Sequence, residues 1–181
     1  MSNSLCQTPL AWLSHLEQLC LDHACGLPQQ EQSDEEWCGI GFRLGDLYLV
    51  APLGEVAEIL TPPRLSKVPR TKSWVCGIAN VRGNLIPIMD LQAYLHDRPA
   101  SMSRRSRILV VSHEGALSGL VVDAVIGLRY FRDDQRCDDL PGDDARIQEY
   151  MTHGFRVGSE HWGVFSMHGL AEAPKFLRAA V

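Results

Sequence analysis

The chain has 181 residues, of which 45% are hydrophobic, and this length suits one domain or two small domains that share a core. Its formal net charge of -5 gives no overall basic footprint, which argues against nucleic acid or an anionic membrane as the main partner. No apolar run approaches the roughly 18 residues that a membrane helix needs. No signal-peptide pattern opens the chain, so we expect a cytoplasmic protein.

The first segment predicts a helix. Thr8 can cap it, Pro9 fits the first helical position, and Gly26 and Pro28 are typical of its end. Between these limits the apolar residues recur at helical spacing; they are Trp12, Leu13, Leu16, Leu19 and Cys20. The polar and acidic stretch 29–36 follows without periodicity, and we interpret it as a linker.

Six cysteines lie at positions 6, 20, 25, 38, 76 and 137, and no pair has C-x-x-C spacing. The group Cys20, His23 and Cys25 fits no standard zinc pattern, and no second half-site follows it. We therefore expect free thiols in a reducing compartment, with no metal and no cofactor.

From Cys38 onward the chain predicts short strands separated by two-residue turns. The turn pairs are Gly45-Asp46, Gly83-Asn84, Glu114-Gly115 and Gly158-Ser159, and each lies between strand-like runs. No periodic segment of helix length separates them. The pattern favours an all-β barrel or sandwich over alternating βαβ units.

Two segments, 49–60 and 119–130, have a similar arrangement. Each places an apolar strand before an acid, a valine and a second short strand, and Val56 and Val125 fall at matching positions. Two small barrels of similar plan would produce this similarity, and so would chance.

The stretch 132–146 contains three Asp-Asp pairs but lacks the D-x-D-x-D-G pattern of a calcium loop. It predicts a solvated connecting loop. Near the end of the chain, Pro174 followed by Phe176 and Leu177 indicates a short docking helix.

The usual catalytic signatures G-x-S-x-G, H-E-x-x-H and the P-loop are missing. His113-Glu114 begins like a zinc-protease helix, but Leu117 stands where the second histidine would be. No motif in the sequence pairs His153, His161 or His168 with a nucleophile. We therefore do not expect an enzyme.

Arg82 lies beside a predicted turn between two apolar runs. A partly buried guanidinium without a partner would cost about 3–5 kcal/mol, so Arg82 needs a carboxylate. Glu58 is the only acid in the apolar run 56–60, and we predict a Glu58–Arg82 ion pair. The pair would act either as a structural latch between strands or as part of a recognition surface at the rim of an apolar patch.

The stretch C-G-I-A-N-V-R-G-N-L-I-P-I-M-D-L at 76–91 resembles the signature of CheW-like domains, G-x-x-N-x-R-G-x-x-x-P-x-x-D-L. The matching positions are Gly77, Asn80, Arg82, Gly83, Pro87, Asp90 and Leu91. Val56 and Glu58 fill the V-x-E of the family's opening strands, and Val122, Asp123 and Val125 fill the V-D-x-V of its second half. The resemblance extends over about residues 38 to 170.

The helix beginning T-P-L, the polar linker and the stretch W-C-G-I-G-F-R-L-G-D-L-Y-L-V-A-P at 37–52 resemble the PilI branch of this family. Members of that branch are adaptors of pilus-associated chemosensory systems that control twitching motility.

The resemblance implies an all-β fold of two intertwined five-stranded SH3-like barrels, here with an N-terminal helical extension. On this basis residues 1–37 form a helix and linker, 38–170 form the CheW-like domain, and 171–181 form a C-terminal tail.

The resemblance also implies a non-catalytic scaffold that couples the tip of a methyl-accepting chemoreceptor to the regulatory domain of a CheA-type histidine kinase. Such a protein is recruited to membrane-associated arrays without inserting into the membrane, and it binds no nucleic acid. Glu58, Asn80 and Arg82 match family positions important for signalling and assembly. We add Val56, Leu60 and Val125 as apolar contacts, and we interpret Gly77, Gly83, Pro87, Asp90 and Asp123 as structural.

Two alternatives stay open. The chain could be a CheW-like adaptor for a different signalling partner, addressed by its N-terminal helix. It could also be a small-molecule sensor or enzyme that uses the groove between the barrels.

Overall fold

The computed structural model describes residues 12–13, 15, 17–19, 36–97 and 102–180. The chain divides into two compact units, Met1–Ser33 and Asp34–Val181. In the first unit the described residues, which include Trp12 and Leu19, are helical, as predicted. The predicted cap, the predicted end of this helix, the group at Cys20, His23 and Cys25, and most of the linker lie outside the described residues.

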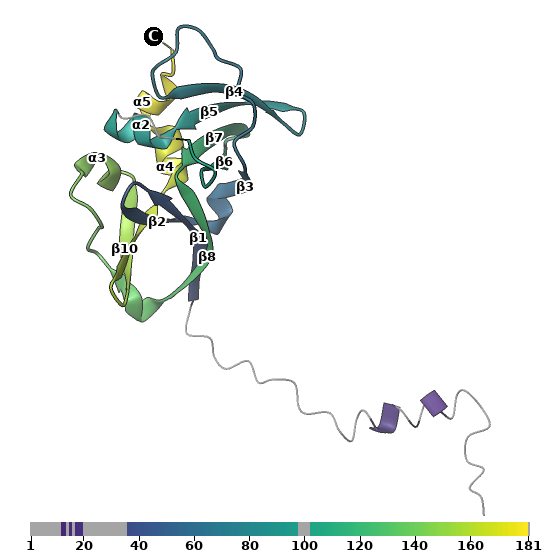
Figure 1. Cartoon of the computed structure of the whole chain (residues 1–181). Helices are drawn as coiled ribbons and strands as arrows, with labels where there is room; N and C mark the ends of the chain where they lie inside the picture. The colour runs from purple at the N-terminus through teal and green to yellow at the C-terminus, as the bar shows by residue number, and fades with distance from the viewer. Residues whose placement is uncertain (1–11, 14, 16, 20–35, 98–101, 181) are drawn as a thin grey trace, which may run out of the picture. The chain divides into compact units, whose positions relative to one another are not determined.

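The second unit is built from two β-sheets (Figure 1). The six-stranded sheet has the order β8-β1-β2-β11-β10-β9 and the five-stranded sheet the order β3-β6-β7-β5-β4. The strands are β1 (Glu36–Leu44), β2 (Leu47–Pro52), β3 (Val56–Leu60), β4 (Val75–Val81), β5 (Asn84–Asp90), β6 (Arg107–His113), β7 (Ala116–Val122), β8 (Ala124–Arg132), β9 (Arg136–Cys137), β10 (Met151–Val157) and β11 (Glu160–Phe165). The all-β prediction is confirmed, and the sixth strand is the two-residue β9.

Short helices occupy some of the connections. They are η1 (Leu53–Glu55), α2 (Leu91–His96), η2 (Asp133–Gln135), α3 (Ala145–Gln148), α4 (Met167–Glu172) and α5 (Pro174–Leu177). The sequence predicted only the last of these, where the Phe176 ring stacks on Trp74 with centroids 5.7 Å apart. The six-residue helices α2 and α4 are too short for periodicity to reveal. A polar side chain caps each one: Asp90 Oδ1 accepts from Ala93 N, and Ser166 Oγ accepts from Gly169 N.

The two sheets are intertwined because the chain crosses between them twice. It leaves the six-stranded sheet at η1, builds all five strands of the other sheet, and returns at Asp123. Strands β1 and β2 therefore complete a sheet whose other strands come from the C-terminal half. This is the intertwined arrangement that the family resemblance implied.

The two sheets also repeat one plan. In sheet order, β8-β1-β2-β11-β10 corresponds to β3-β6-β7-β5-β4, with the same alternation of antiparallel and parallel pairs. In the six-stranded sheet Val125 pairs with Phe42 next to a β-bulge. In the five-stranded sheet Val56 pairs with Val111, also next to a β-bulge. The similarity between segments 49–60 and 119–130 thus reflects the two equivalent crossings, as the two-barrel interpretation predicted.

The buried residues that the structure describes form three apolar clusters. One fills the five-stranded sheet and includes Ala79, Ile86, Ile88, Ile108, Val110 and Val121. A second fills the six-stranded sheet and includes Val50, Phe131, Phe155, Trp162 and Val164. The third and largest draws on both sheets and on α2 and α4, with Phe42, Leu109, Tyr94 and Leu170 among its members. This shared cluster fixes the two sheets to one another.

Three of the four predicted hairpin turns lie where the sequence placed them, at Gly45-Asp46, Glu114-Gly115 and Gly158-Ser159. The fourth is shifted by one residue. Val81 pairs with Asn84, so the turn residues are Arg82 and Gly83, with φ of 50° and 89°. A type I′ turn needs positive φ at both central residues, and Arg82 adopts it although it has a Cβ atom.

The acidic stretch 132–146 is more ordered than the predicted solvated loop. It contains η2, β9 and the start of α3, and its acids form local ion pairs: Asp134 with Arg132, Asp139 with Arg156, and Asp144 with Arg146 and His96. Hydrogen bonds from the Arg146 side chain are the main reason why the pKa of Asp144 is lowered to about 2. The prediction of a solvated loop was therefore wrong in part, because the sequence could not show the partners that are distant in the chain, Arg156 for Asp139 and His96 for Asp144.

Gly77 offers a direct test of the fold. Its φ is 142°, and a Cβ atom there would lie 2.5 Å from the backbone oxygen of Ser66. We expect Gly77→Ala to lower the free energy of unfolding by about 3 kcal/mol, because strain and a backbone clash combine. Urea denaturation measures this change.

Two glycines serve as controls. Gly83 has a φ of 89° with open space around its Cβ direction, so Gly83→Ala should cost only about 1 kcal/mol. Gly54 has neither constraint, and Gly54→Ala should change stability by less than about 0.5 kcal/mol. Equal losses at all three positions would contradict the interpretation.

We expect the stability of the protein to depend on pH through His153, which lies in the six-stranded sheet. Its ring packs on Trp37 and Phe155, and its Nε2 is buried without a hydrogen-bond partner. Burial, followed by the charge of Arg136, lowers the pKa of His153, while Asp138 opposes the shift. The unfolded chain therefore binds the proton more readily, so stability falls as the pH drops below about 6.5.

We expect His153→Gln to flatten this dependence. The melting temperature of the original protein should fall more steeply between about pH 7 and about pH 5 than that of the variant, because only the original must protonate a buried ring. Parallel melting curves over this range would rule out the assignment.

Candidate docking surface

The predicted ion pair is present. Arg82 Nη2 lies 2.7 Å from Glu58 Oε1. Glu58 belongs to β3 and Arg82 to the tip of the β4–β5 hairpin, and β3 and β4 are the two outermost strands in the order of their sheet. The pair therefore spans the seam where the curled sheet closes, and not two neighbouring strands as the sequence suggested.

The pair is far more exposed than the sequence predicted. The Arg82 side chain is 80% exposed and the Glu58 side chain 25% exposed. The expectation of a partly buried guanidinium is therefore wrong, because the hairpin carries Arg82 beyond the packed part of the sheet. An exposed ion pair stabilises a fold by only about 0–1 kcal/mol, which is too little for an essential latch.

The equivalent seam of the six-stranded sheet has no carboxylate at the position that corresponds to Glu58. In the six-stranded sheet Gly127 pairs with Gly41. The equivalent pair in the five-stranded sheet is Glu58 with Val110, so a glycine occupies the position that corresponds to Glu58. The turn equivalent to Arg82-Gly83 is Gly158-Ser159. That seam is held by Phe131 stacked on Phe155, with ring centroids 4.5 Å apart. The shared plan thus does not require the ion pair.

Asn80 orients the turn that presents Arg82. Its Oδ1 accepts a hydrogen bond of 2.8 Å from Gly83 N, and the residue itself is exposed. Gly83 supplies the positive φ of the second turn position. Asn80 and Gly83 together fix the direction in which the guanidinium leaves the hairpin.

The remaining motif residues have structural contacts. Gly77 allows the close approach of Ser66, and Pro87 lies in β5 one residue before the pairing with β7 begins at Ile88. Asp90 is buried and caps α2. Asp123 Oδ2 accepts a 2.6 Å hydrogen bond from Gly45 N, which ties the return crossing to the β1–β2 turn.

The predicted apolar contacts are half-buried. Val56 and Val125 pack against the shared cluster, and Leu60 packs against the core of the five-stranded sheet. Sequence reasoning missed Ile59 and Leu85, which are 42% and 74% exposed. Ile59 follows Glu58, and Leu85 pairs with Asn80 on the hairpin. The inside-outside alternation of strand 56–60 could have identified Ile59, but nothing local marks Leu85.

The described part of the chain holds no group of three or more His, Cys, Asp or Glu side chains that could bind a metal ion. Within the same residues no helix is long and apolar enough to cross a membrane. Burial raises the pKa of the Cys76 thiol to about 11, which disfavours its reactive thiolate form. The arrangement around Glu58 and Arg82 is therefore one of charge and exposed apolar surface.

Comparison with known proteins gives a consistent result. The CheW-like domain family matches residues 39–175. Protein PilI of Pseudomonas aeruginosa is 43% identical over 175 residues, which cover 97% of this chain and 98% of that protein. FrzA of Myxococcus xanthus is 36% identical over 101 residues, and the alignment spans 61% of its length.

The fold has a counterpart among solved structures. The crystal structure of the scaffolding protein TtCheW from Thermoanaerobacter tengcongensis superposes with a TM-score of 0.67 at 23% identity. The match covers 80% of this chain and 94% of that one. The likeness supports the description of the fold given above.

The stability of the pair can be tested. We expect Glu58→Gln and Arg82→Gln each to lower the free energy of unfolding by less than about 1 kcal/mol, because the guanidinium is exposed and screened by solvent. Urea denaturation at moderate salt measures both changes.

Asp90→Ala is the comparison. It removes a buried helix cap and should cost about 1–3 kcal/mol. A loss at Glu58 or Arg82 as large as the loss at Asp90 would restore the interpretation of the pair as a latch.

Proposed function

The chain belongs to the CheW-like domain family, and on that premise we propose that it couples a chemoreceptor to a CheA-type histidine kinase. The family consists of non-catalytic scaffold proteins, so the chain is an adaptor of chemotaxis-type signalling and not an enzyme. We further propose that this system controls twitching motility by type IV pili. The similarity to PilI over nearly the whole of both chains supports this assignment.

The observation that carries the proposal is the exposed Glu58–Arg82 pair. It occurs in one of two equivalent barrels and contributes little to closing the seam, so the fold does not account for it. The strand that carries Glu58 and the hairpin that carries Arg82 also expose Ile59 and Leu85, and such a combination of charged and apolar side chains is common in protein interfaces.

We assign two partners to this protein, the regulatory domain of the kinase and the tip of a methyl-accepting chemoreceptor. Glu58, Asn80 and Arg82 contribute the polar contacts, while Ile59 and Leu85 contribute the main apolar ones. The exposed parts of Val56, Leu60 and Val125 add to the apolar area. Binding to these partners would recruit the protein to membrane-associated arrays without insertion into the lipid.

We also propose a division of roles along the chain. Residues 38–170 would form the scaffold, and 1–37 would address it to a partner, with 171–181 packing as a tail. Deleting residues 1–35, which leaves β1 and its Trp37 intact, and measuring both interactions separates this role from a purely structural one, since an addressing segment should affect one partner selectively.

The proposal predicts micromolar or tighter binding to the kinase regulatory domain, to the receptor tip, or to both, measured by isothermal titration calorimetry. Arg82→Ala should weaken at least one interaction about tenfold, equivalent to about 1.4 kcal/mol. Arg82→Lys should weaken it less, because the charge is kept although the forked geometry is lost. Arg132→Ala is the matched control, since Arg132 is also an exposed arginine in an ion pair, on the other sheet.

A charge swap separates recognition from a latch. Glu58→Arg combined with Arg82→Glu can rebuild the ion pair while reversing the surface presented to a partner. If the pair recognises a partner, the protein with both substitutions should stay folded but bind that partner no better than Arg82→Ala does. Full recovery of binding by the swap would exclude the recognition role, and a folded protein that binds neither partner would exclude the proposed function.

A further inference from the structure

The two halves of the second unit carry opposite charge, which the net charge of the chain conceals. The five-stranded half, residues 56–122 and 173–180, has eleven lysines and arginines against four aspartates and glutamates, a net of +7. The six-stranded half, 36–55 and 123–172, has six against thirteen, a net of -7. The C-terminal segment is counted with the five-stranded half because Thr71 pairs with Ala180.

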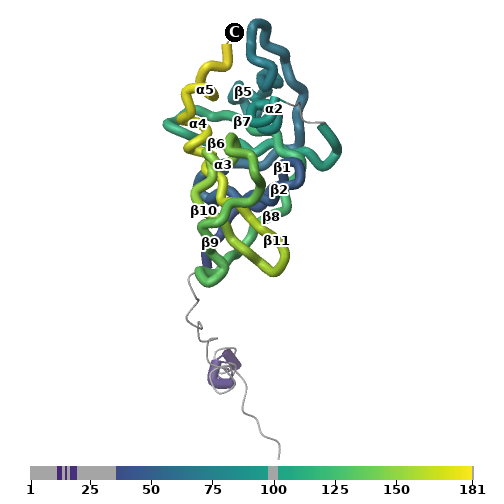
Figure 2. Tube along the Cα trace, turned by 90° about the vertical axis from the view of Figure 1, so that its left-hand side faces the viewer, coloured from purple at the N-terminus to yellow at the C-terminus, as the bar shows by residue number. Residues whose placement is uncertain are grey.

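The opposite charges concentrate in equivalent connections. The segment 61–74 links β3 to β4 and contains four cations and no acid, namely Arg64, Lys67, Arg70 and Lys72. Its counterpart 133–150 links β8 to β10 and contains seven acids and two arginines. Figure 2 shows the first connection at the end of the unit that holds the C-terminus, and β9, which lies within the second connection, at the opposite end.

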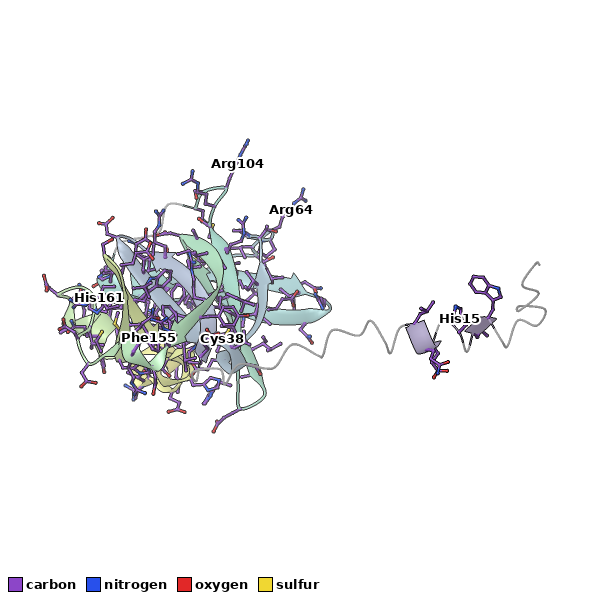
Figure 3. All side chains as sticks on the ribbon, turned by 90° about the horizontal axis from the view of Figure 1, so that it is seen from below. His15, Cys38, Arg64, Arg104, Phe155 and His161 are labelled. Carbon is purple, nitrogen blue, oxygen red and sulfur yellow. The ribbon has the colours of Figure 1, made fainter. Side chains whose placement is uncertain are left out.

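Three basic segments meet at the first of these ends. Leu60 pairs with Ile108, so the connection that leaves β3 starts beside the basic segment 102–107 that enters β6. Lys72 N donates to Ala179 O, which brings the connection against Arg178. In Figure 3 the labelled Arg64 and Arg104 extend from the same side of the unit. We define the basic surface as Arg64, Lys67, Arg70, Lys72, Arg104, Arg105, Arg107 and Arg178.

These cations lack counter-charges. None of the eight forms an ion pair with any residue that the structure describes, and all except the half-buried Arg107 are exposed. Arg107 donates only to the backbone oxygens of Arg104 and Ser106. So many unpaired cations in one region produce a positive potential that attracts an anionic partner.

We propose that the basic surface binds an Asp/Glu-rich segment of a partner protein, at a site separate from Glu58 and Arg82. The inference rests on the proposed function in one respect, that the partners of this chain are proteins. Six of the eight cations are arginines, whose planar guanidinium matches a carboxylate with two parallel hydrogen bonds.

The composition of the surface favours this partner over nucleic acid or a membrane. The aromatic rings nearest in sequence, Trp74 and Phe176, are buried, so they offer no stacking platform for bases. Leu65 and Val68 in the basic connection are only partly exposed, and Leu65 packs against the core. The connection therefore keeps its apolar side chains away from a lipid surface.

The acidic half of a second copy is a weaker candidate. Asp134, Asp139 and Asp144 already form ion pairs within their own half. Docking a basic surface there would have to compete with these local partners. A segment whose carboxylates are free carries no such cost.

Fluorescence anisotropy with a short labelled peptide of alternating Asp and Glu tests the proposal. We expect binding at about 0.1 M NaCl that weakens at least about tenfold at about 1 M, where the Debye length falls from about 10 Å to about 3 Å. The same peptide with Asn and Gln should not bind.

A matched pair of variants locates the site. Replacing Arg64, Arg70, Arg104 and Arg105 by Gln should weaken peptide binding at least about tenfold. Replacing Arg132, Arg136, Arg146 and Arg156 by Gln changes the net charge equally and should leave binding within about twofold. Kinase binding measured on both variants distinguishes this site from the proposed docking surface, because neither variant alters Glu58 or Arg82.

Three results would overturn the proposal. Equal peptide affinity of the two variants would show non-specific attraction. Binding to duplex DNA or to vesicles containing phosphatidylserine that is tighter than binding to the peptide, at equal concentration of negative charge, would indicate a different anionic partner. Salt-sensitive self-association in analytical ultracentrifugation, lost in the first variant, would assign the surface to a second copy.

Discussion

The double crossing of the chain is the constraint on which the rest of this structure depends. Because β1 and β2 complete a sheet that also needs β8 to β11, the six-stranded sheet cannot form from one continuous segment of the chain, whereas the five-stranded sheet is built from the continuous segment 56–122. The shared apolar cluster then forms only when both sheets are in place. Asp123 and Glu55 stabilise the two crossings, Asp123 through Gly45 N and Glu55 through the backbone N–H groups of Met167 and His168. The surfaces on both barrels are therefore held in a fixed relation.

The sequence predicted the features that depend on local chemistry. Turn pairs containing glycine set the hairpins, and alternating apolar residues set the strands between them. The partner of Arg82 was predicted correctly, but the reason given for it, the cost of burying an unpaired guanidinium, does not apply to a side chain that is 80% exposed. The equivalence of Val56 and Val125 was visible because both follow a crossing in the same register.

The sequence could not predict what depends on distant contacts. The exposure of Arg82 follows from how far its hairpin extends beyond the sheet, and the one-residue shift of its turn follows from the pairing of Val81 with Asn84. The helices α2 and α4 are single capped turns or little more, below the length at which periodicity is detectable. The opposite charges of the two halves do not appear in the net charge of the chain, because +7 and -7 cancel. The first 35 residues then account for the net charge of -5.

A repeated fold gives an internal control for function. Where both barrels have the same feature, as with the bulge after Val56 and Val125, the fold itself explains it. Where they differ in exposed charged residues, packing of the core does not require the difference. The ion pair occurs in one barrel and a glycine replaces it in the other, and the equivalent connections 61–74 and 133–150 carry opposite charge. The charges that differ are carried mainly by exposed side chains, and we propose partner recognition as the constraint behind both asymmetries.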